Sequence, residues 1–225
     1  MIWWYKSKFN NNCKTSEIMK KSFQTVGIFS LLAMTLLNCS PPNPLPSPAP
    51  CVTTGTAFQN LYASTLASNT AYSNQVTMDL ITHEYTFTLS STKTVCAIGY
   101  QGNANLFAAA VPYTIEIVDN SSSSTTPIYS GNHIFNASFT DYVLPTSTIV
   151  LNAGTSYTIR RKAPNFLGNI GNTVGRLCKF SSPSAPTVVP YPVTSGIMTI
   201  TGSNFYGIGL SAINFGIPFI DLTFQ

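Results

Sequence analysis

Alternation of apolar and polar residues from residue 75 onward constrains this fold more than any other feature of the sequence. In the segment 84–89, Tyr85, Phe87 and Leu89 alternate with Glu84 and two threonines. Period-two runs rich in β-branched and aromatic residues are typical of strands that bury one face. Further runs of this kind are 75–80, 94–100, 113–118, 134–144, 148–151, 156–161, 197–201 and 217–224.

Residues that favour turns separate these runs. They are Gly102-Asn103, Asp119-Asn120-Ser121, Ser130-Gly131-Asn132, Asn152-Ala153-Gly154 and Gly168-Asn169. No segment after residue 75 shows a convincing helical period of 3.6 residues. Residues 75–225 are therefore predicted to form an all-β domain, an antiparallel β-sandwich of about eight to ten strands.

Two motifs in this domain resemble a known class of module. Residues 96–100 (CAIGY) and 151–159 (LNAGTSYTI) are similar to motifs of the jelly-roll β-sandwich modules of bacterial exported and cell-surface proteins, and the likeness extends over residues 84–161. The resemblance implies a jelly-roll arrangement with residues 217–224 as the closing strand. Such modules often accompany carbohydrate-active or adhesive domains, but the motifs themselves are structural.

A separate pattern precedes the β-rich part. Residues 19–38 begin with Met19, Lys20 and Lys21 and continue into an apolar run from Val26 to Leu37. Charge followed by a short apolar stretch is typical of a signal peptide, and the run is shorter than the roughly 20 apolar residues of a membrane-spanning helix. We therefore expect residues 19–38 to direct export.

The end of this segment, Leu36-Leu37-Asn38-Cys39, resembles the lipobox of bacterial lipoproteins. The resemblance implies cleavage before Cys39 and lipidation of that cysteine, although Asn38 stands where the family usually has a small residue. Ser40 follows the cysteine where an aspartate would imply retention in the inner membrane. The resemblance thus implies a lipid anchor at the bacterial outer membrane or cell surface.

The remaining N-terminal segments have distinct compositions. Residues 1–18 fit no part of a signal peptide, and we expect translation to start at Met19. Residues 39–50 contain six of the fifteen prolines of the chain, which predicts a semi-rigid, disordered tether of roughly 30 Å. Residues 51–74 are small and polar, and the sequence leaves open whether this lead-in is extended or forms a weak helix over 58–66.

The charge of the chain excludes one class of partner. Only 8% of the residues are charged, and five of the eleven basic residues precede residue 39. From residue 39 onward six basic residues face six acidic ones. Nucleic-acid binding needs a basic surface that this balance does not supply.

Three cysteines lie in the expected mature domain, where export permits a disulfide. Cys96 and Cys178 both occupy strand-like segments, which favours a disulfide between them. Cys51 is the alternative partner of Cys178, and three reduced, buried thiols are the other alternative. The spacing of cysteines and histidines predicts no metal site.

Catalytic patterns are weak. His83 and His133 lack the motif of a nucleophile elbow, so we expect both to be solvated. Glu116 and Asp221 lie in predicted strands and are expected to face solvent rather than to form a catalytic carboxyl pair. The turn that begins at Asp119 is expected to be a capped turn, with a structural calcium ion as the alternative use of its oxygens.

Two further groups are candidates for binding. Arg160, Arg161 and Lys162 form a basic run whose alternation places Arg161 on the opposite side from its neighbours, and we expect a solvated strand end. Tyrosines at predicted strand ends or loops could stack on sugars, although sandwich aromatics are mostly core. They are Tyr100, Tyr129, Tyr142, Tyr191 and Tyr206.

Taken together, the sequence predicts a bacterial cell-surface lipoprotein. Its sandwich is expected to be a non-catalytic display or binding module for a glycan or another surface partner, with no cofactor. Two alternatives are a secreted hydrolase with an undetected site and a purely structural envelope protein. Exposed tyrosines on one sheet face would favour binding, and a cleft that joins two acids, or a histidine and a serine, would favour an enzyme.

Overall fold

The computed structural model describes residues 50–76, 80–163, 175–180, 189–207 and 209–225. The predicted segments 1–18 and 19–38, the lipidation site Cys39 and the predicted tether up to residue 49 lie outside the described residues. Asp79 and the predicted turn at 168–169 also lie outside them. The structure therefore bears on the chain from residue 50 onward.

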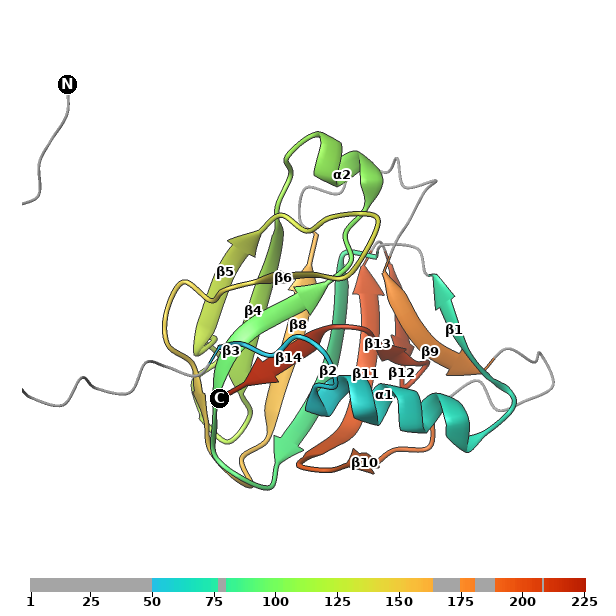
Figure 1. Ribbon diagram of the computed structural model, residues 1–225, viewed down its shortest axis with the longest axis vertical. Coiled ribbons are helices and arrows are strands. Elements are labelled where there is room, and N and C mark those ends of the chain that lie inside the picture. Colours follow the sequence, from blue (N-terminus) through green and yellow to red (C-terminus); the bar gives the residue numbers. More distant parts are fainter. Residues whose placement is uncertain (1–49, 77–79, 164–174, 181–188, 208) are drawn as a thin grey trace, which may run out of the picture. The chain divides into compact units, whose positions relative to one another are not determined.

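The described chain folds mainly into antiparallel strands (Figure 1). Its elements are α1 (Ala57–Ser68), β1 (Tyr72–Val76), β2 (Thr82–Leu89), β3 (Lys93–Tyr100), α2 (Ala104–Ala108), β4 (Tyr113–Asp119), β5 (Tyr129–His133), β6 (Asp141–Val143), β7 (Val150–Leu151), β8 (Tyr157–Lys162), β9 (Arg176–Phe180), β10 (Val193–Ser195), β11 (Met198–Gly207), β12 (Leu210–Ile213), β13 (Ile217–Pro218) and β14 (Asp221–Phe224). The predicted all-β, antiparallel sandwich is confirmed.

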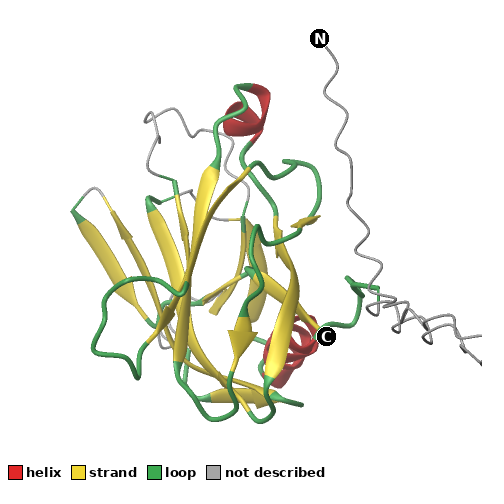
Figure 2. Cartoon of the chain, turned by 90° about the vertical axis from the view of Figure 1, so that its left-hand side faces the viewer, coloured by secondary structure: helices red, strands yellow, loops and turns green. Residues whose placement is uncertain are grey.

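Three sheets make up the sandwich (Figures 1 and 2). In the largest, the strand order is β10-β11-β2-β8-β4-β5, and β12 also pairs with β11. A smaller sheet has the order β14-β3-β6, with β7 also paired to β3, and a third sheet has the order β1-β9-β13. The two helices lie at opposite ends of the domain.

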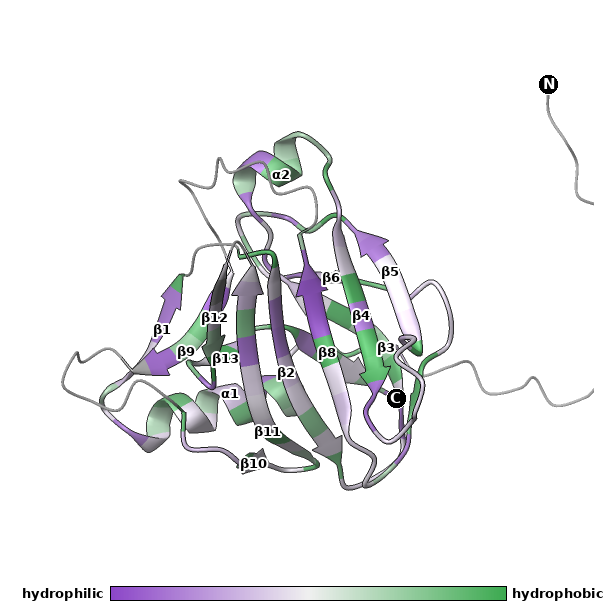
Figure 3. Cartoon of the chain, turned by 180° about the vertical axis from the view of Figure 1, so that it is seen from behind, coloured by the Kyte–Doolittle hydropathy of each residue, from purple (hydrophilic) through white to green (hydrophobic). Residues whose placement is uncertain are grey.

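Aromatic rings fill the space between the layers. Tyr100 of β3 packs edge-on against Tyr113 of β4, with ring centroids 5.3 Å apart. Phe58 of α1 stacks on Tyr85 of β2 at 5.4 Å. The inner face of the large sheet is thus covered partly by the β14-β3-β6 sheet and partly by α1. Figure 3 shows the opposite, outer face, where hydrophilic residues mark the upper part of β8.

Helix α1 brings residues 51–74 into the domain. The hydroxyl oxygen of Thr56 accepts a hydrogen bond from the backbone N–H of Gln59 and caps the helix. Phe58, Leu61 and Tyr62 are buried, as is Thr65 one turn later, so one face of the helix packs on the core. Residues 57–68 of the predicted lead-in thus form a helix that packs on the core ahead of the predicted boundary at residue 75, and strand β1 begins at Tyr72.

The strand pattern differs from the prediction around residues 129–144. The predicted turn at 130–132 lies inside the edge strand β5. This strand needs a glycine at position 131. The Tyr129 and His133 side chains bond to each other over it, and a Cβ there would collide with both.

The predicted strand 134–144 is a strand only at β6, Asp141–Val143. The side chain of Asn136 accepts a hydrogen bond from the backbone N–H of Ser138, which favours a turn within this segment. The described residues form fourteen strands rather than eight to ten. Much of the excess consists of short strands such as β10, β12 and β13.

The disulfide differs from the favoured pairing. Cys51 bonds to Cys96, with the two Cα atoms 5.6 Å apart, and Cys178 is a buried free thiol. The predicted Cys96–Cys178 bridge is therefore wrong, as are the alternative with Cys51 on Cys178 and the fully reduced alternative. The physical reason is the path of the chain, which brings Cys51 beside Cys96 of β3, while Cys178 lies in β9 between β1 and β13.

Candidate functional site

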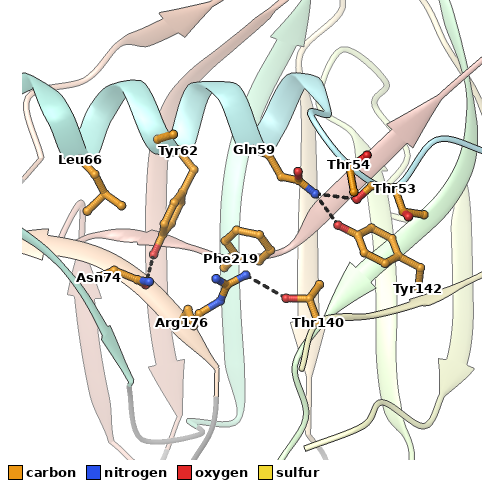
Figure 4. A pocket seen from close by; sticks show the side chains of 11 residues that line it. Thr53, Thr54, Gln59, Tyr62, Leu66, Asn74, Thr140, Tyr142, Arg176 and Phe219 are labelled. Atoms are coloured by element: carbon orange, nitrogen blue, oxygen red, sulfur yellow. Dashed lines mark hydrogen bonds between the residues drawn. The ribbon is translucent and has the colours of Figure 1, made fainter. Parts of the chain in front are cut away.

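A cleft of about 420 Å³ opens beside α1, between this helix and strands β1, β6 and β9 (Figure 4). Three aromatic rings, two side-chain amides, several hydroxyl groups and one guanidinium line it. The lining residues are Thr53, Thr54, Gln59, Tyr62, Ala63, Leu66, Asn74, Thr140, Tyr142, Arg176 and Phe219. A concave surface that combines apolar walls with a few polar groups is typical of small-ligand sites.

A buried carboxylate organises one end of the cleft. Asp221 is fully buried, and its Oδ2 accepts hydrogen bonds from the Tyr142 hydroxyl at 2.7 Å and from Gln59 Nε2 at 2.8 Å. Its Oδ1 accepts a third bond from the Thr56 hydroxyl at 2.8 Å. The prediction that Asp221 faces solvent is wrong, because α1 and β6 cover this carboxyl group.

Gln59 and Tyr142 are the members of this network that reach the cleft. The amide nitrogen of Gln59 also donates to the backbone oxygen of Thr53 at 2.9 Å and lies 2.6 Å from the Tyr142 hydroxyl. The Tyr142 ring lies directly over Gly99, where a Cβ would stand 2.5 Å from the ring. The glycine of the CAIGY motif therefore makes room for a cleft-lining tyrosine.

Burial has the largest effect on the pKa values of Asp221 and Tyr142. It raises the pKa of Asp221 above its usual value, although the hydrogen bonds from Tyr142, Thr56 and Gln59 act in the opposite direction. Burial also raises the pKa of Tyr142, helped by its hydrogen bond to Asp221. Tyr142 therefore stays a neutral hydrogen-bond donor at neutral pH.

The other end of the cleft carries a cation. The Arg176 guanidinium carbon lies 3.8 Å from the centre of the Phe219 ring, and Nη2 donates to the Thr140 hydroxyl at 2.8 Å. Nearby, the Tyr62 hydroxyl donates to Asn74 Oδ1 at 2.9 Å. Figure 4 shows Arg176 between this pair and Tyr142.

The histidines lie away from this cleft and are buried, so the prediction that they are solvated is wrong. His83 is 1% exposed and packs against Phe205, and its Nε2 accepts a hydrogen bond from the Leu80 backbone N–H at 3.3 Å. His133 bonds to the Tyr129 hydroxyl at 2.7 Å, and burial lowers its pKa. Aromatic neighbours exclude water from both rings.

The basic run divides between two environments, as the alternation predicted. On the outer face, Arg160 pairs with Glu84 at 3.1 Å and Glu116 at 3.7 Å, and Lys162 pairs with Glu116 at 2.8 Å. The prediction that the whole run is a solvated strand end is wrong for Arg161. That residue is fully buried.

The core accommodates the Arg161 guanidinium because two aromatic rings and a carbonyl group surround it. Its guanidinium carbon lies 5.2 Å from the Tyr100 ring centre and 5.4 Å from the Tyr113 ring centre. Its Nη1 donates to the Leu80 backbone oxygen at 2.7 Å. Cation–π contacts of this kind stabilise a desolvated guanidinium.

The five candidate tyrosines do not form one exposed platform. Tyr100 and Tyr129 belong to the core. Tyr191 and Tyr206 are half-buried, and their hydroxyls donate to the Gly216 backbone oxygen and to Glu84 respectively. Of these five side chains, Tyr142 is the one that lines the cleft.

The turn at residues 119–121 is capped from within. Asp119 Oδ1 accepts hydrogen bonds from the Ser121 backbone N–H at 2.8 Å and from its hydroxyl at 2.6 Å. These bonds lower the pKa of Asp119. Within the described part of the chain, no group of three or more His, Cys, Asp or Glu residues is placed to hold a metal ion.

Most residues of the cleft escaped the sequence-based search. Gln59, Tyr62, Asn74, Thr140 and Arg176 come from α1, β1, the segment before β6, and β9. The spacing of apolar residues at 58, 61 and 62 could have identified the helix. No local pattern, however, relates that helix to an arginine more than 100 residues later.

No protein-family model matches the chain, and no curated protein sequence matches it. No helix within the described ranges combines the length and the hydropathy needed to cross a membrane. A proposal for function therefore depends on the residues of the domain itself.

Proposed function

We propose that this chain is a bacterial cell-surface lipoprotein whose β-sandwich binds a saccharide in the cleft beside α1. The export and anchoring part of the proposal rests on the order of Lys20-Lys21, the apolar run and Cys39 in the sequence. The binding part rests on the composition of the cleft. The module is non-catalytic in this proposal.

The observation that carries the binding proposal is the set of groups that share the cleft. Tyr142 supplies a half-buried aromatic ring beside the largely buried rings of Tyr62 and Phe219, while Gln59 and Asn74 supply amides. Sugars present apolar C–H faces and closely spaced hydroxyls, so they are matched by aromatic rings beside groups that donate and accept hydrogen bonds. The volume of about 420 Å³ suits one or two sugar rings.

The environment of Asp221 favours binding over hydrolysis. Glycoside hydrolysis requires carboxyl groups that contact the scissile bond. Asp221 is the carboxyl group behind this cleft, but it is fully buried and accepts three side-chain hydrogen bonds. Its chemistry is that of an organising group, which fixes Gln59 and Tyr142 for contact with a ligand.

Filling the cleft tests the proposal. Ala63 is an exposed α1 residue that lines the cleft, and Ala67 is an exposed residue one turn later outside the lining set. The detergent-extracted full chain is applied to a panel of immobilised neutral and acidic polysaccharides. We expect retention on at least one of them, with affinity reduced at least tenfold by Ala63→Trp and unchanged by Ala67→Trp. Retention that Ala63→Trp leaves intact, or none on any polysaccharide, would contradict the proposal.

A further inference from the structure

We propose that the saccharide bound in this cleft is anionic, and that Arg176 recognises its carboxylate or sulfate group. This inference rests on the proposed saccharide-binding function. It goes further in naming the chemical class of the ligand and the residue that selects it. The supporting observations concern the position of the guanidinium, its hydrogen-bond partners and its neighbours.

Arg176 is held in the cleft by packing rather than by an ion pair. It begins β9, where Val76 of β1 is its neighbour across the ladder. The guanidinium lies over Phe219, a ring that is 6% exposed and belongs to the core. Stacking on a fixed ring restricts the rotamers of the arginine, so little conformational entropy remains to be lost when a ligand binds.

The guanidinium has hydrogen-bonding capacity to spare. Its one side-chain acceptor among the described residues is the Thr140 hydroxyl, a neutral group, at 2.8 Å. Within the same residues its Nε–H has no acceptor, and no carboxylate lies within ion-pair distance of the guanidinium. Arg160 and Lys162 contrast with it, because Arg160 pairs with Glu84 and Glu116 and Lys162 pairs with Glu116.

The carboxylate nearest in the network does not form an ion pair with Arg176. Asp221 directs its oxygens at Thr56, Gln59 and Tyr142, and these donors satisfy them. At Tyr142, burial and the neighbouring Asp221 raise the pKa, and the positive charge of Arg176 lowers it by a smaller amount. The positive charge that a ligand would meet is therefore local to the Arg176 end of the cleft, away from Asp221.

A further donor lies beside the guanidinium. Asn74 accepts from Tyr62 through Oδ1, which turns the amide NH₂ group away from that bond. A planar guanidinium fork pairs with both oxygens of a carboxylate or sulfate, and an adjacent amide can donate to the same group. The hydroxyl oxygens of a neutral sugar also accept hydrogen bonds, but they carry no charge and do not match the guanidinium fork, so we expect weaker binding.

The test compares ligands that share a sugar backbone and differ in whether they carry a negative charge. Polygalacturonate and its fully methyl-esterified form share a backbone, and galacturonate and galactose serve as soluble competitors. We expect the full chain to bind the acidic polymer at least tenfold more tightly than the ester, with galacturonate the stronger competitor. A sulfated galactan in the same assay distinguishes sulfate from carboxylate as the preferred anion.

Variants on one strand assign the effect to its residue. Arg176→Gln is expected to abolish the preference for the acidic polymer, and Arg176→Lys is expected to keep the preference with weaker binding. Lys179→Gln removes a cation from the same strand that lies over Phe215, outside the cleft lining, and should change nothing. Should Arg176→Gln fail to fold, the competition between galacturonate and galactose on the unmodified protein decides the question.

The outcomes separate this inference from the proposed function. Equal binding of acidic and neutral polymers that Ala63→Trp abolishes would overturn the anionic class and leave saccharide binding in place. A preference for the acidic polymer that Arg176→Gln retains would overturn the role of Arg176. Absence of binding to every polymer would remove both proposals together.

Discussion

Single side chains in this domain connect segments that are far apart in sequence. Asp221 near the C-terminus accepts hydrogen bonds from Thr56 and Gln59 at the start of α1 and from Tyr142 of β6. Each of these donors would need another partner if the carboxylate were absent. Because a buried donor without an acceptor is costly, one residue couples the position of α1 to that of β6.

The raised pKa of Asp221 predicts a pH dependence of stability. The folded state holds the proton more tightly than the unfolded state, in which the pKa is near its usual value of 3.8. The contribution of Asp221 to the free energy of unfolding is therefore full below that value and is lost as pH rises through the folded pKa. Urea denaturation of the unmodified protein across this window should show the decline.

Asp221→Asn provides the matched comparison, because asparagine has nearly the same volume as aspartate but does not titrate. The amide nitrogen of the asparagine would face the donors of Gln59 and Tyr142, so we expect the variant to lose about 1–3 kcal/mol of stability. The deficit should shrink as pH rises from about 4, since the unmodified protein then loses its own contribution. A deficit that stays constant with pH would show that the group does not titrate as predicted.

At the scale of elements, the entry of the chain into the domain is fixed twice. Cys51 is bonded to Cys96 of β3. Helix α1 begins at Ala57, six residues after Cys51. The helix then covers the part of the large sheet around Tyr85. The disulfide thus fastens the start of the domain to the central strand of the β14-β3-β6 sheet, which limits fraying of that start.

Loss of this disulfide should be costly. Cys51 and Cys96 are 45 residues apart, and closing a loop of that size stabilises a fold by about 2–4 kcal/mol. We expect Cys51→Ala to lower the free energy of unfolding by this amount and to abolish the effect of added reductant. Chemical denaturation with and without reductant measures both.

Cys178 is the control for this measurement. It is a free, buried thiol, and burial raises its pKa to about 12, which keeps it protonated and unreactive. Cys178→Ala removes a packed sulfur atom, but it should leave the difference between oxidised and reduced protein intact. If Cys178→Ala rather than Cys51→Ala removed that difference, the assigned pairing would be incorrect.

At the scale of the whole molecule, a proposed lipid anchor at Cys39 would hold a nearly charge-balanced domain at a surface. The cleft beside α1 is lined by one guanidinium, that of Arg176, so attraction to a ligand would be local rather than spread over the molecule. Such an arrangement suits capture of a saccharide already present at the envelope. Long-range steering would require a larger charged surface.

Intact mass of the membrane-extracted protein tests the anchor. We expect a mass equal to residues 39–225 plus acyl chains, and loss of the acylated form in a Cys39→Ala variant. The cause would be cleavage before Cys39 and acylation of its sulfur and new amino group. An unacylated mass that retains residues before Cys39, or one that reports cleavage elsewhere, would refute the anchor and the surface location with it.

Local pattern was sufficient to predict the fold class. Alternation at 84–89, 94–100 and 113–118 corresponds to β2, β3 and β4, and the run 156–161 corresponds to β8. The predictions failed where a local signal was ambiguous. Gly131 and its neighbours have the composition of a turn, yet they form edge strand β5, because the Tyr129 and His133 side chains pair across the glycine.

The cleft and the disulfide could be decided only by the tertiary structure. A sequence shows which residues alternate, because strand periodicity is local, but it does not show which strand lies beside which. Cys96 bonds to Cys51 rather than Cys178 because the chain enters the domain beside β3, while Cys178 lies in β9 between β1 and β13. Tertiary packing also buries Asp221 and places Arg176 in a cleft. Helix α1 packs near β9 and β14, which follow it in the sequence by more than 100 residues.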